Sequence, residues 1–420
     1  MRVLQVTDDL PPAPRGGLDW HVRQLNAELR QHDVESIVLK LAVGEAQRVA
    51  DLDSDWSSDN PGDIGRERPV TVEFGEPASA DGGLVGQILN SPVIEAFEEA
   101  LDRLEPDAVH IHNLQHLSHR IVEVARRRGI QTVWTMHDFF ALCQRVHLHR
   151  ADGAACDGPK SGVACGPCHG GGLKGLLASP VFALRNIGFL AAMRSAHVLV
   201  APSRFLADII IAHGAPADRV HVLAPAVPRA ARMADMASDP FVTRLVFAGD
   251  LREAKGADLC IEALRLLDRP EVALEVHGGS APPPAPAEHA FEERLRTLAQ
   301  GTRTEFFGRY QDLDMMQFLD GAAALVVPSR VRETFSRTAN RALQLGVPVI
   351  AANHGALPEY VTEGVNGALF EPGDAASLAA AMGRIAQDGV SMQSNAPMWP
   401  EVPDLAEHVQ ALLPLYVWRP

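Results

Sequence analysis

The chain has 420 residues, of which 46% are hydrophobic and 22% are charged, and its formal net charge is −15. This length and composition suffice for two domains with large cores, and they exclude a disordered chain or a single small module. The acidic balance argues against nucleic acid as the main partner and weakens the case for lasting attachment to anionic lipid, although a local basic patch is compatible with it.

The start of the chain and its apolar runs bear on where the protein acts. Met1 is followed at once by RVLQVT, a buried-strand pattern, so we expect no secretory signal. The longest apolar runs, such as residues 196–201 and 323–327, have the length of strands, and we expect no membrane span. These features favour a cytoplasmic protein.

Short apolar runs alternate with amphipathic segments, a pattern typical of parallel sheets wound with crossover helices. The strands predicted in the first half are Val3–Val6, Ser36–Leu39, Val70–Phe74, Ala108–Ile111, Thr132–Thr135, Val198–Ala201 and Val220–Leu223. After a proline-rich stretch at 224–243, a second series follows: Leu245–Ala248, Leu274–His277, Glu305–Phe307, Ala324–Val327 and Val347–Ala351.

This pattern predicts an α/β protein with two Rossmann-like domains, residues 1–225 and 226–400, and a ligand site in the cleft between them. Residues 401–420 are predicted to form a helix that packs back towards the N-terminal domain.

Two glycines follow the first predicted strand, in the segment DDLPPAPRGG. Gly16 and Gly17 let the backbone approach a ligand closely, and Leu18–Leu29 has helical spacing, so free N–H groups at the helix start could face a phosphate. An anion site and a flexible loop are both compatible with this pattern.

Histidines gather after two strands of the first domain. In DAVHIHNLQHLSH, His110 and His112 share one face of a strand, which permits a metal pair, but we favour buried histidines because no carboxylate completes a ligand set nearby. After Thr132–Thr135, His137 and Asp138 lie at the carboxyl edge, where open sheets bind ligands. A neutral histidine there can hydrogen-bond a substrate hydroxyl, and the alternative is a structural pair that closes the turn.

Four cysteines are spaced C-x12-C-x8-C-x2-C within a loop at 143–172: Cys143, Cys156, Cys165 and Cys168. Four thiolates complete a tetrahedral zinc site without an open position, so such a zinc would fold the loop rather than catalyse. Two disulfides or free thiols are the alternatives. Three nearby histidines could substitute as ligands: His147, His149 and His169.

The second domain carries two polar segments after its strands. In FAGDLREAKG, Lys255 lies where a helix begins and could meet a diphosphate, whereas a solvated helix start is the simpler interpretation. In VVPSRVRETFSRTANRALQLGVPVIA, Glu333 precedes a helix predicted from about Phe335 to Leu345. The first amides of that helix could receive phosphate oxygens, and Glu333 could accept hydrogen bonds from hydroxyls.

In order and spacing these segments resemble the retaining glycosyltransferases of family four, which have the GT-B architecture, and in particular members with a four-cysteine loop in the N-terminal domain. The motifs that carry the resemblance are GGLDWHVRQL, VHIHN, TMHDFFALC, APSRF, KG at Lys255–Gly256, FFG at Phe306–Gly308, P-S-x-x-x-E-x-F, GVPVIA and NGALF-x-PGD. They cover most of the chain.

The resemblance implies a UDP-type or GDP-type sugar donor held by the C-terminal domain, a small soluble acceptor held by the N-terminal domain, and no catalytic metal. The implied catalytic residues are His137 on the transferred sugar, Glu333 on its hydroxyls, and Lys255 on the leaving phosphate. The implied donor-site residues are Gly16, Gly17, Asp250, Arg252, Phe335, Ser336, Arg337 and Arg341, and those on the acceptor side are Arg15, His116 and Asp138.

Two positions depart from the family pattern and reverse charge in the donor site. Arg341 stands where a second glutamate usually binds the ribose, and Asp250 stands where an arginine is usual. Either the two residues pair with each other, or Arg341, Arg252 or Arg337 meets the phosphates. The same departures support an alternative function, a catalytically degenerate GT-B protein that binds a ligand or partner without transferring sugar.

Overall fold

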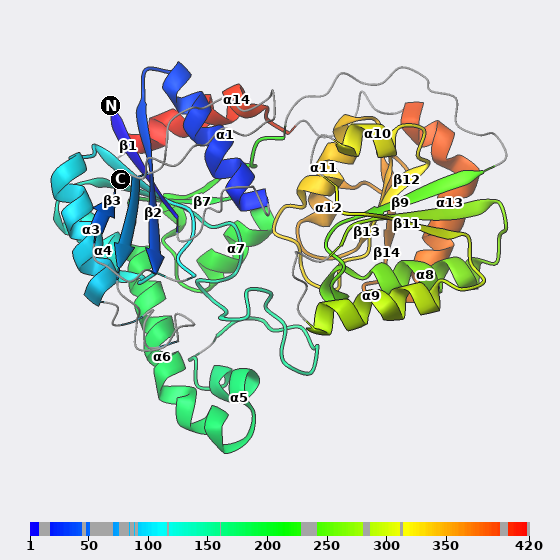
Figure 1. Ribbon diagram of the computed structural model, residues 1–420, viewed down its shortest axis with the longest axis horizontal. Helices are drawn as coiled ribbons and strands as arrows, with labels where there is room; N and C mark the ends of the chain where they lie inside the picture. Colours follow the sequence, from blue (N-terminus) through cyan, green and yellow to red (C-terminus); the bar gives the residue numbers. More distant parts are fainter. Residues whose placement is uncertain are drawn as a thin grey trace. The chain divides into compact units, whose positions relative to one another are not determined.

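The computed structural model (Figure 1) describes residues 1–7, 17–43, 48–50, 70–74, 84, 88, 91–115, 117–159, 161–227, 242–279, 286–310, 314–394 and 402–417. The chain divides into two compact units. Unit 1 comprises Met1–Ala226 together with Leu405–Pro420, and unit 2 comprises Val227–Asp404.

Unit 1 contains an eight-stranded sheet in the order β3-β4-β2-β1-β5-β6-β7-β8, in which the pairing of β3 with β4 is antiparallel and all other pairings are parallel. Its strands are β1 (Arg2–Thr7), β2 (Glu35–Val43), β3 (Arg48–Ala50), β4 (Val70–Phe74), β5 (Ala108–Ile111), β6 (Gln131–Thr135), β7 (Val198–Ala201) and β8 (Val220–Val222). Its helices are α1 (Gly17–Gln31), α3 (Ser91–Leu104), α4 (Arg120–Arg127), α5 (Cys165–Gly170), α6 (Gly172–Ser195), α7 (Arg204–Ala212) and α14 (Leu405–Leu412), followed by 3₁₀ turns at Ala217–Arg219 and Leu413–Tyr416.

The two faces of this sheet are covered by different helices because successive side chains of a strand point to opposite faces. Val3 packs with Leu25 of α1 and Val409 of α14. Leu4 belongs to the second core cluster, which includes Phe97 of α3 and Phe189 of α6. The C-terminal helix α14 is therefore part of the core of unit 1.

Unit 2 contains a six-stranded, fully parallel sheet in the order β11-β10-β9-β12-β13-β14. Its strands are β9 (Thr243–Ala248), β10 (Val272–His277), β11 (Thr304–Gly308), β12 (Ala324–Val327), β13 (Val349–Ala352) and β14 (Gly367–Phe370). Its helices are a 3₁₀ turn at Glu253–Lys255, α8 (Ala257–Leu267), α9 (Pro286–Leu298), α10 (Met315–Leu319), α11 (Arg337–Gln344), α12 (Leu357–Tyr360) and α13 (Ala375–Ser394).

The predicted α/β class with two parallel sheets is confirmed, and every predicted strand is present with small shifts of its ends. Two strands were missed: β3, a three-residue edge strand, and β14. Helix α11 begins at Arg337, two residues later than predicted, because Ser336 is its N-cap and has a left-handed backbone with φ of 63°.

Each sheet has one point at which the strand order reverses direction. In unit 1 the chain runs from β1 outward to β2 and β4 and then returns to β5 beside β1, and in unit 2 it returns to β12 beside β9. Open α/β sheets bind ligands outside the carboxyl ends of the strands at such points. These two positions are therefore where we look for a site.

Candidate active site

Polar and imidazole side chains fill the reversal point of unit 1. Gln5 comes from β1, His112 follows β5, His137 follows β6, and His21 comes from the first half of α1. The backbone N–H of His112 donates to the carbonyl of Val6 on β1 at 2.9 Å, so the chain leaving β5 is still tied to the neighbouring strand.

A hydrogen-bond chain fixes the tautomers of two of these histidines. His112 Nε2 lies 2.6 Å from Gln5 Oε1, and because an amide oxygen only accepts, Nε2 carries the proton. His112 Nδ1 is then an acceptor and receives the Nε2–H of His137 at 3.2 Å. This assignment leaves Nδ1 of His137 with a lone pair.

Gln5 is held in turn by the C-terminal segment. Its amide nitrogen donates to the Tyr416 hydroxyl at 3.4 Å, and the hydroxyl donates to Nδ1 of His110 at 2.9 Å. The other ring nitrogen of His110 donates to the Thr135 hydroxyl at 2.7 Å. Burial raises the pKa of Tyr416, so its hydroxyl stays protonated.

His110, His112, His137 and His408 are neutral near pH 7. Burial, followed by the charge of His408, lowers the pKa of His137 to about 3, and burial lowers the pKa of His110 and of His112 well below the ordinary value. His408 of α14, whose pKa burial lowers to about 4, donates from Nδ1 to the carbonyl of Ala224 at 2.8 Å.

Among the described residues, one group of three or more potential metal ligands has its donor atoms within 4.8 Å of one another: His21, His112 and His137. Neutral imidazoles are suitable ligands for zinc or copper, and the Gln5 oxygen on the far nitrogen of His112 would orient that ring equally well for a metal. The arrangement can therefore act either as a hydrogen-bond chain or as a three-histidine cation site.

A partly buried ion pair lies at the reversal point of unit 2. Lys255 Nζ lies 2.8 Å from Glu333 Oε1, and the same oxygen accepts the Ser329 hydroxyl at 2.5 Å. The Lys255 side chain is 37% exposed. Burial alone would lower the pKa of Lys255, but the charge and hydrogen bond of Glu333, with the charge of Asp250, raise it, so the ammonium persists.

Close backbone packing holds Lys255 in place. Gly256 has φ of 75°, and a Cβ there would lie 2.3 Å from the carbonyl oxygen of Pro328, so glycine is required where the turn approaches the end of β12. Arg330 reinforces the approach, because it donates to both carboxylate oxygens of Asp258 at 2.6 and 3.1 Å and to the carbonyl of Glu253 at 2.8 Å.

The sequence model described as Glycosyltransferase Family 4 matches residues 15–230, and the model described as Glycosyl transferases group 1 matches residues 242–388. This chain belongs to glycosyltransferase family 4.

Named relatives agree with that membership. The chain is 28% identical over 330 residues to D-inositol 3-phosphate glycosyltransferase 1 of Catenulispora acidiphila, covering 73% of this chain and 70% of the relative. It is 25% identical over 409 residues to glycogen synthase of Mycobacterium tuberculosis, covering 94% and 88%. Its fold is similar to that of Anabaena HepE, solved in complex with UDP, with a TM-score of 0.66, 18% identity, and coverage of 98% of both chains. The architecture is thus GT-B.

The structure places the other predicted residues of this family 4 glycosyltransferase in different settings. Arg15, Gly16 and His116 lie outside the described residues, and Gly17 is the first residue of α1. The carboxylate of Asp138 accepts the backbone N–H of Phe140 at 2.7 Å, which is the turn-closing role that was the alternative for this residue.

The residues expected around the donor phosphates are divided between surface and core. Arg252 is paired with Glu288 at 2.9 Å, and Asp250 is exposed beside Lys255. Arg341 is buried, and between these two described residues no ion pair is present, so the structure does not show the first of the two alternatives given for Asp250 and Arg341. Arg337 is the first residue of α11.

Phe335 and Ser336 form the entry to α11. Phe335 is buried, with its ring edge-on to Tyr360 at 5.4 Å, and its carbonyl accepts the Asn340 amide at 3.2 Å. The Ser336 hydroxyl accepts the N–H of Ala339 at 3.4 Å. These contacts fix the strained backbone at Ser336, where the polypeptide turns into the helix.

The four cysteines of the 143–172 loop are free thiols in the structure and lie near one another. Burial, and then the neighbouring Cys143, Cys156 and Cys168, raises the pKa of Cys165, although a contact from Asn186 opposes it. Among the described residues the four sulfurs do not form a group within 4.8 Å, so a zinc with bonds of about 2.3 Å would require the loop to contract.

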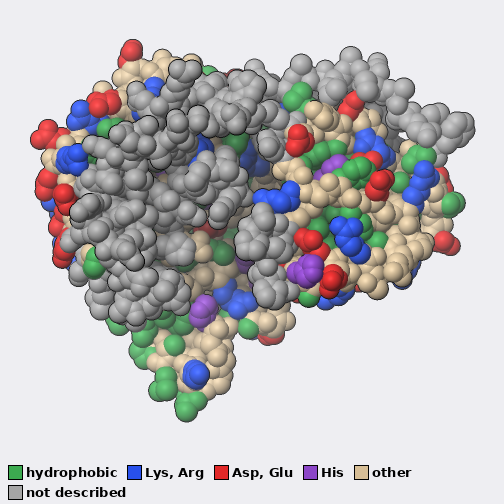
Figure 2. Space-filling model, in the orientation of Figure 1, with side chains coloured by type: hydrophobic (Ala, Val, Ile, Leu, Met, Phe, Trp, Pro, Cys, Tyr) green, Lys and Arg blue, Asp and Glu red, His purple; other side chains and the backbone are tan. Residues whose placement is uncertain are grey.

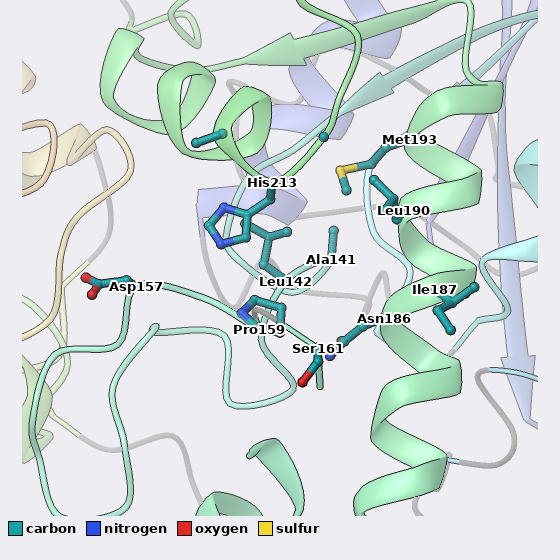
Figure 3. A pocket seen from close by; sticks show the side chains of 12 residues that line it. Ala141, Leu142, Asp157, Pro159, Ser161, Asn186, Ile187, Leu190, Met193 and His213 are labelled. Carbon is teal, nitrogen blue, oxygen red and sulfur yellow. The ribbon is translucent and has the colours of Figure 1, made fainter. Parts of the chain in front are cut away.

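A separate pocket of about 610 Å³ lies beside this loop, between α6 and the end of α7 (Figure 3). Leu142, Leu190 and Met193 supply apolar lining, and His213 and Asp157 supply polar groups. None of the residues predicted for the active site lines it.

Several residues of both sites were not singled out from the sequence. Gln5 is one polar residue inside an apolar strand, which is the available signal that a buried partner exists. His21 lies within an ordinary amphipathic helix pattern, and Tyr416 lies more than 270 residues from the histidines it supports. Ser329 belongs to the P-S-x-x-x-E-x-F motif, which by itself indicates no contact with Glu333.

Proposed function

We propose that this glycosyltransferase moves a sugar from a nucleoside-diphosphate donor of UDP or GDP type to a small soluble acceptor in the cytoplasm, with retention of anomeric configuration and without a catalytic metal. The Lys255–Glu333 pair at the reversal point of unit 2 is the observation that carries the proposal. The UDP bound to the structurally similar HepE supports the choice of donor class.

In unit 2, Lys255 stabilises the leaving diphosphate. Its ammonium is paired yet accessible, so it can meet a phosphate oxygen whose negative charge grows as the glycosidic bond breaks. Glu333 keeps the lysine protonated and accepts hydrogen bonds from hydroxyls of the transferred sugar. The amides of Phe335 and Ser336 at the start of α11 donate to the diphosphate.

In unit 1, His137 binds the transferred sugar as a neutral hydrogen-bonding group. Its lowered pKa excludes a cation at neutral pH, and the hydrogen-bond chain through His112 to Gln5 fixes the orientation of its ring for a contact with a sugar hydroxyl. Gly17 starts the helix that approaches the phosphates, with Gly16 before it.

The reaction proceeds on one face of the sugar. The bond from the anomeric carbon to the phosphate oxygen breaks, the acceptor oxygen forms its bond to the same carbon from the same side, and the acceptor proton passes to the departing phosphate. Nucleoside diphosphate and glycosylated acceptor are the products, and no side-chain nucleophile takes part.

Acceptor-dependent turnover tests this proposal against the degenerate alternative, which Asp250 and Arg341 motivate. Release of nucleoside diphosphate from UDP- and GDP-sugars is measured with and without candidate acceptors. Lys255→Met is expected to lower kcat about 100- to 1000-fold, as loss of one transition-state charge donor does. Arg384→Met, which removes a cation paired with Glu363 at 3.2 Å elsewhere in unit 2, is the matched control. Donor binding without acceptor-dependent release would instead establish the degenerate protein.

A further inference from the structure

The helix α6 has an unusual distribution of apolar side chains. Of the eleven large apolar side chains that are exposed among the described residues, six lie on α6 or just before it: Val163, Leu173, Leu176, Leu177, Leu184 and Ile187. Leu173 and Leu177 are 72% and 70% exposed. The spacing of the five α6 residues places them along one side of the helix, so they form a continuous apolar stripe.

The opposite side of α6 is buried in unit 1, which determines what the helix can do. Phe182 and Arg185 are buried, and Phe189 belongs to the core that covers the sheet. Among the described helices, α6 is the one long and apolar enough to cross a membrane by composition, but it is anchored along its length to the protein. In this fold α6 therefore offers a membrane only its exposed side.

The exposed end of α6 is part of a tightly packed helical hairpin. A Cβ on Gly166 of α5 would lie 2.2 Å from the carbonyl oxygen of Gly175, so the two helices touch backbone to backbone. In Figure 1, α5 and the first turns of α6 extend beyond the sheet of unit 1, and Figure 2 shows the hydrophobic side chains clustered at that end. The leucines are thus held at a convex tip by a rigid support.

The charge of this region is opposite to that of the whole chain. Between Asp157 and Asp208 there is no Asp or Glu, although the chain has 53 of them, and the same stretch contains five Lys and Arg residues. Lys174 lies exposed among the leucines of the tip. Of these five, Arg185 is buried and Lys174 is the one on the first turns of α6, so this apolar end of the helix adds one cation and no carboxylate to a chain whose net charge is −15.

We propose that the α5–α6 tip docks on the surface of a bilayer containing anionic phospholipid, with Leu173, Leu176 and Leu177 in the acyl boundary and Lys174 at the phosphates. A narrow convex tip can insert into lipid, because lipid needs no surface of matching shape. A stable protein–protein interface, in contrast, buries about 800 Å² of accessible surface on each partner. A symmetric pair of two copies through this tip would bring Lys174 against Lys174. Docking does not depend on the proposed sugar transfer.

Vesicle co-sedimentation tests the proposal with the full chain. Phosphatidylcholine vesicles with phosphatidylglycerol are expected to bind the protein about tenfold more strongly than phosphatidylcholine alone, and added salt reduces the difference. The double variant Leu173→Ser, Leu177→Ser is expected to weaken binding at least about tenfold, as does Lys174→Glu on the anionic vesicles. Leu266→Ser on α8, where the leucine is 60% exposed in unit 2, is the control that retains binding.

Vesicle binding, melting temperature and light scattering are all measured without the enzymatic assay. Equal melting temperatures of wild type and variants show that the tip substitutions leave the fold intact. The proposal is overturned if wild type fails to bind anionic vesicles at low salt, or if the double variant binds as wild type does. A concentration-dependent dimer in light scattering that the double variant abolishes, without vesicle binding, would assign the stripe to a second copy of this chain instead.

Discussion

The burial of His119 predicts how the stability of unit 1 depends on pH. Its side chain is 6% exposed and packs beside Phe189 with ring centroids 5.4 Å apart. Neither ring nitrogen has a hydrogen-bond partner among the residues that the structure describes. Burial, and then the charges of Arg120 and Arg185, lowers the pKa of His119 to about 4.

The sign of the pH effect follows from the difference between folded and unfolded states. Between the ordinary histidine pKa of 6.5 and the folded value of about 4, the unfolded chain binds a proton that the folded chain does not. The free energy of unfolding therefore falls as the pH drops below about 6.5. From about pH 7.5 to about pH 5.5 the contribution of His119 to this loss is about 1.3 kcal/mol, and a folded pKa between about 3 and 5 changes that contribution only to about 1.2–1.4 kcal/mol.

The variant His119→Leu removes this titration at similar volume. It is expected to lose about 1.3 kcal/mol less stability than wild type over that pH interval, and to be as stable or more stable at pH 7.5 because no hydrogen bond is deleted. Urea-dependent hydrogen exchange of peptides from β5 and β6 measures the unfolding of unit 1 separately from unit 2. His289→Leu, at an exposed position on α9, is the control.

Equal pH dependence of wild type and His119→Leu would refute the reasoning. That result would mean that water reaches the ring in the folded state, so that its protonation there costs no more than in the unfolded chain.

Three further predictions concern the sites. Gln5→Met keeps volume but removes the acceptor of His112, and kcat measured at saturating donor is expected to fall about tenfold, whereas an unchanged kcat would exclude a positioning role. Arg341→Glu restores the family's usual residue. If Arg341 merely replaces a group that accepts hydrogen bonds from the ribose, calorimetric titration is expected to show tighter binding of nucleoside diphosphate by this variant. A large loss of nucleoside-diphosphate affinity would instead assign Arg341 to the phosphates. Elemental analysis is expected to find one zinc per chain in wild type and none in Cys165→Ser, and EDTA is expected to leave kcat unchanged. Turnover that depends on added metal would instead favour a cation bound by His21, His112 and His137.

The two-sheet α/β architecture could be predicted from the sequence, because the hydrophobic periodicity that marks a strand or a helix lies within a short segment of chain. The buried strands Ala108–Ile111 and Ala324–Val327 were located to the residue, since Asp107 precedes the first and Pro328 ends the second. Lys255 and Glu333 follow strands that are neighbours only in the folded sheet, and their 2.8 Å contact could be anticipated solely from the family resemblance.

Contacts between residues far apart in the chain could not be predicted from the sequence. The contact of Tyr416 with Gln5 and His110 joins the two ends of the chain, and no local pattern records such a contact. The burial of Arg341 was also unpredictable, because an arginine on a helix is usually exposed. The tip of α6 was missed because whole-chain charge averages over a segment that has no carboxylates.

The discontinuity of unit 1 has a consequence for how the protein is made. Its core needs Val409 and Leu412, and its histidine network needs His408 and Tyr416, yet the ribosome produces these residues only after all of unit 2. Domains normally fold in order of synthesis. Here unit 2 can fold first, while the N-terminal sheet still lacks α14 and the Tyr416 hydroxyl that holds Gln5 and His110.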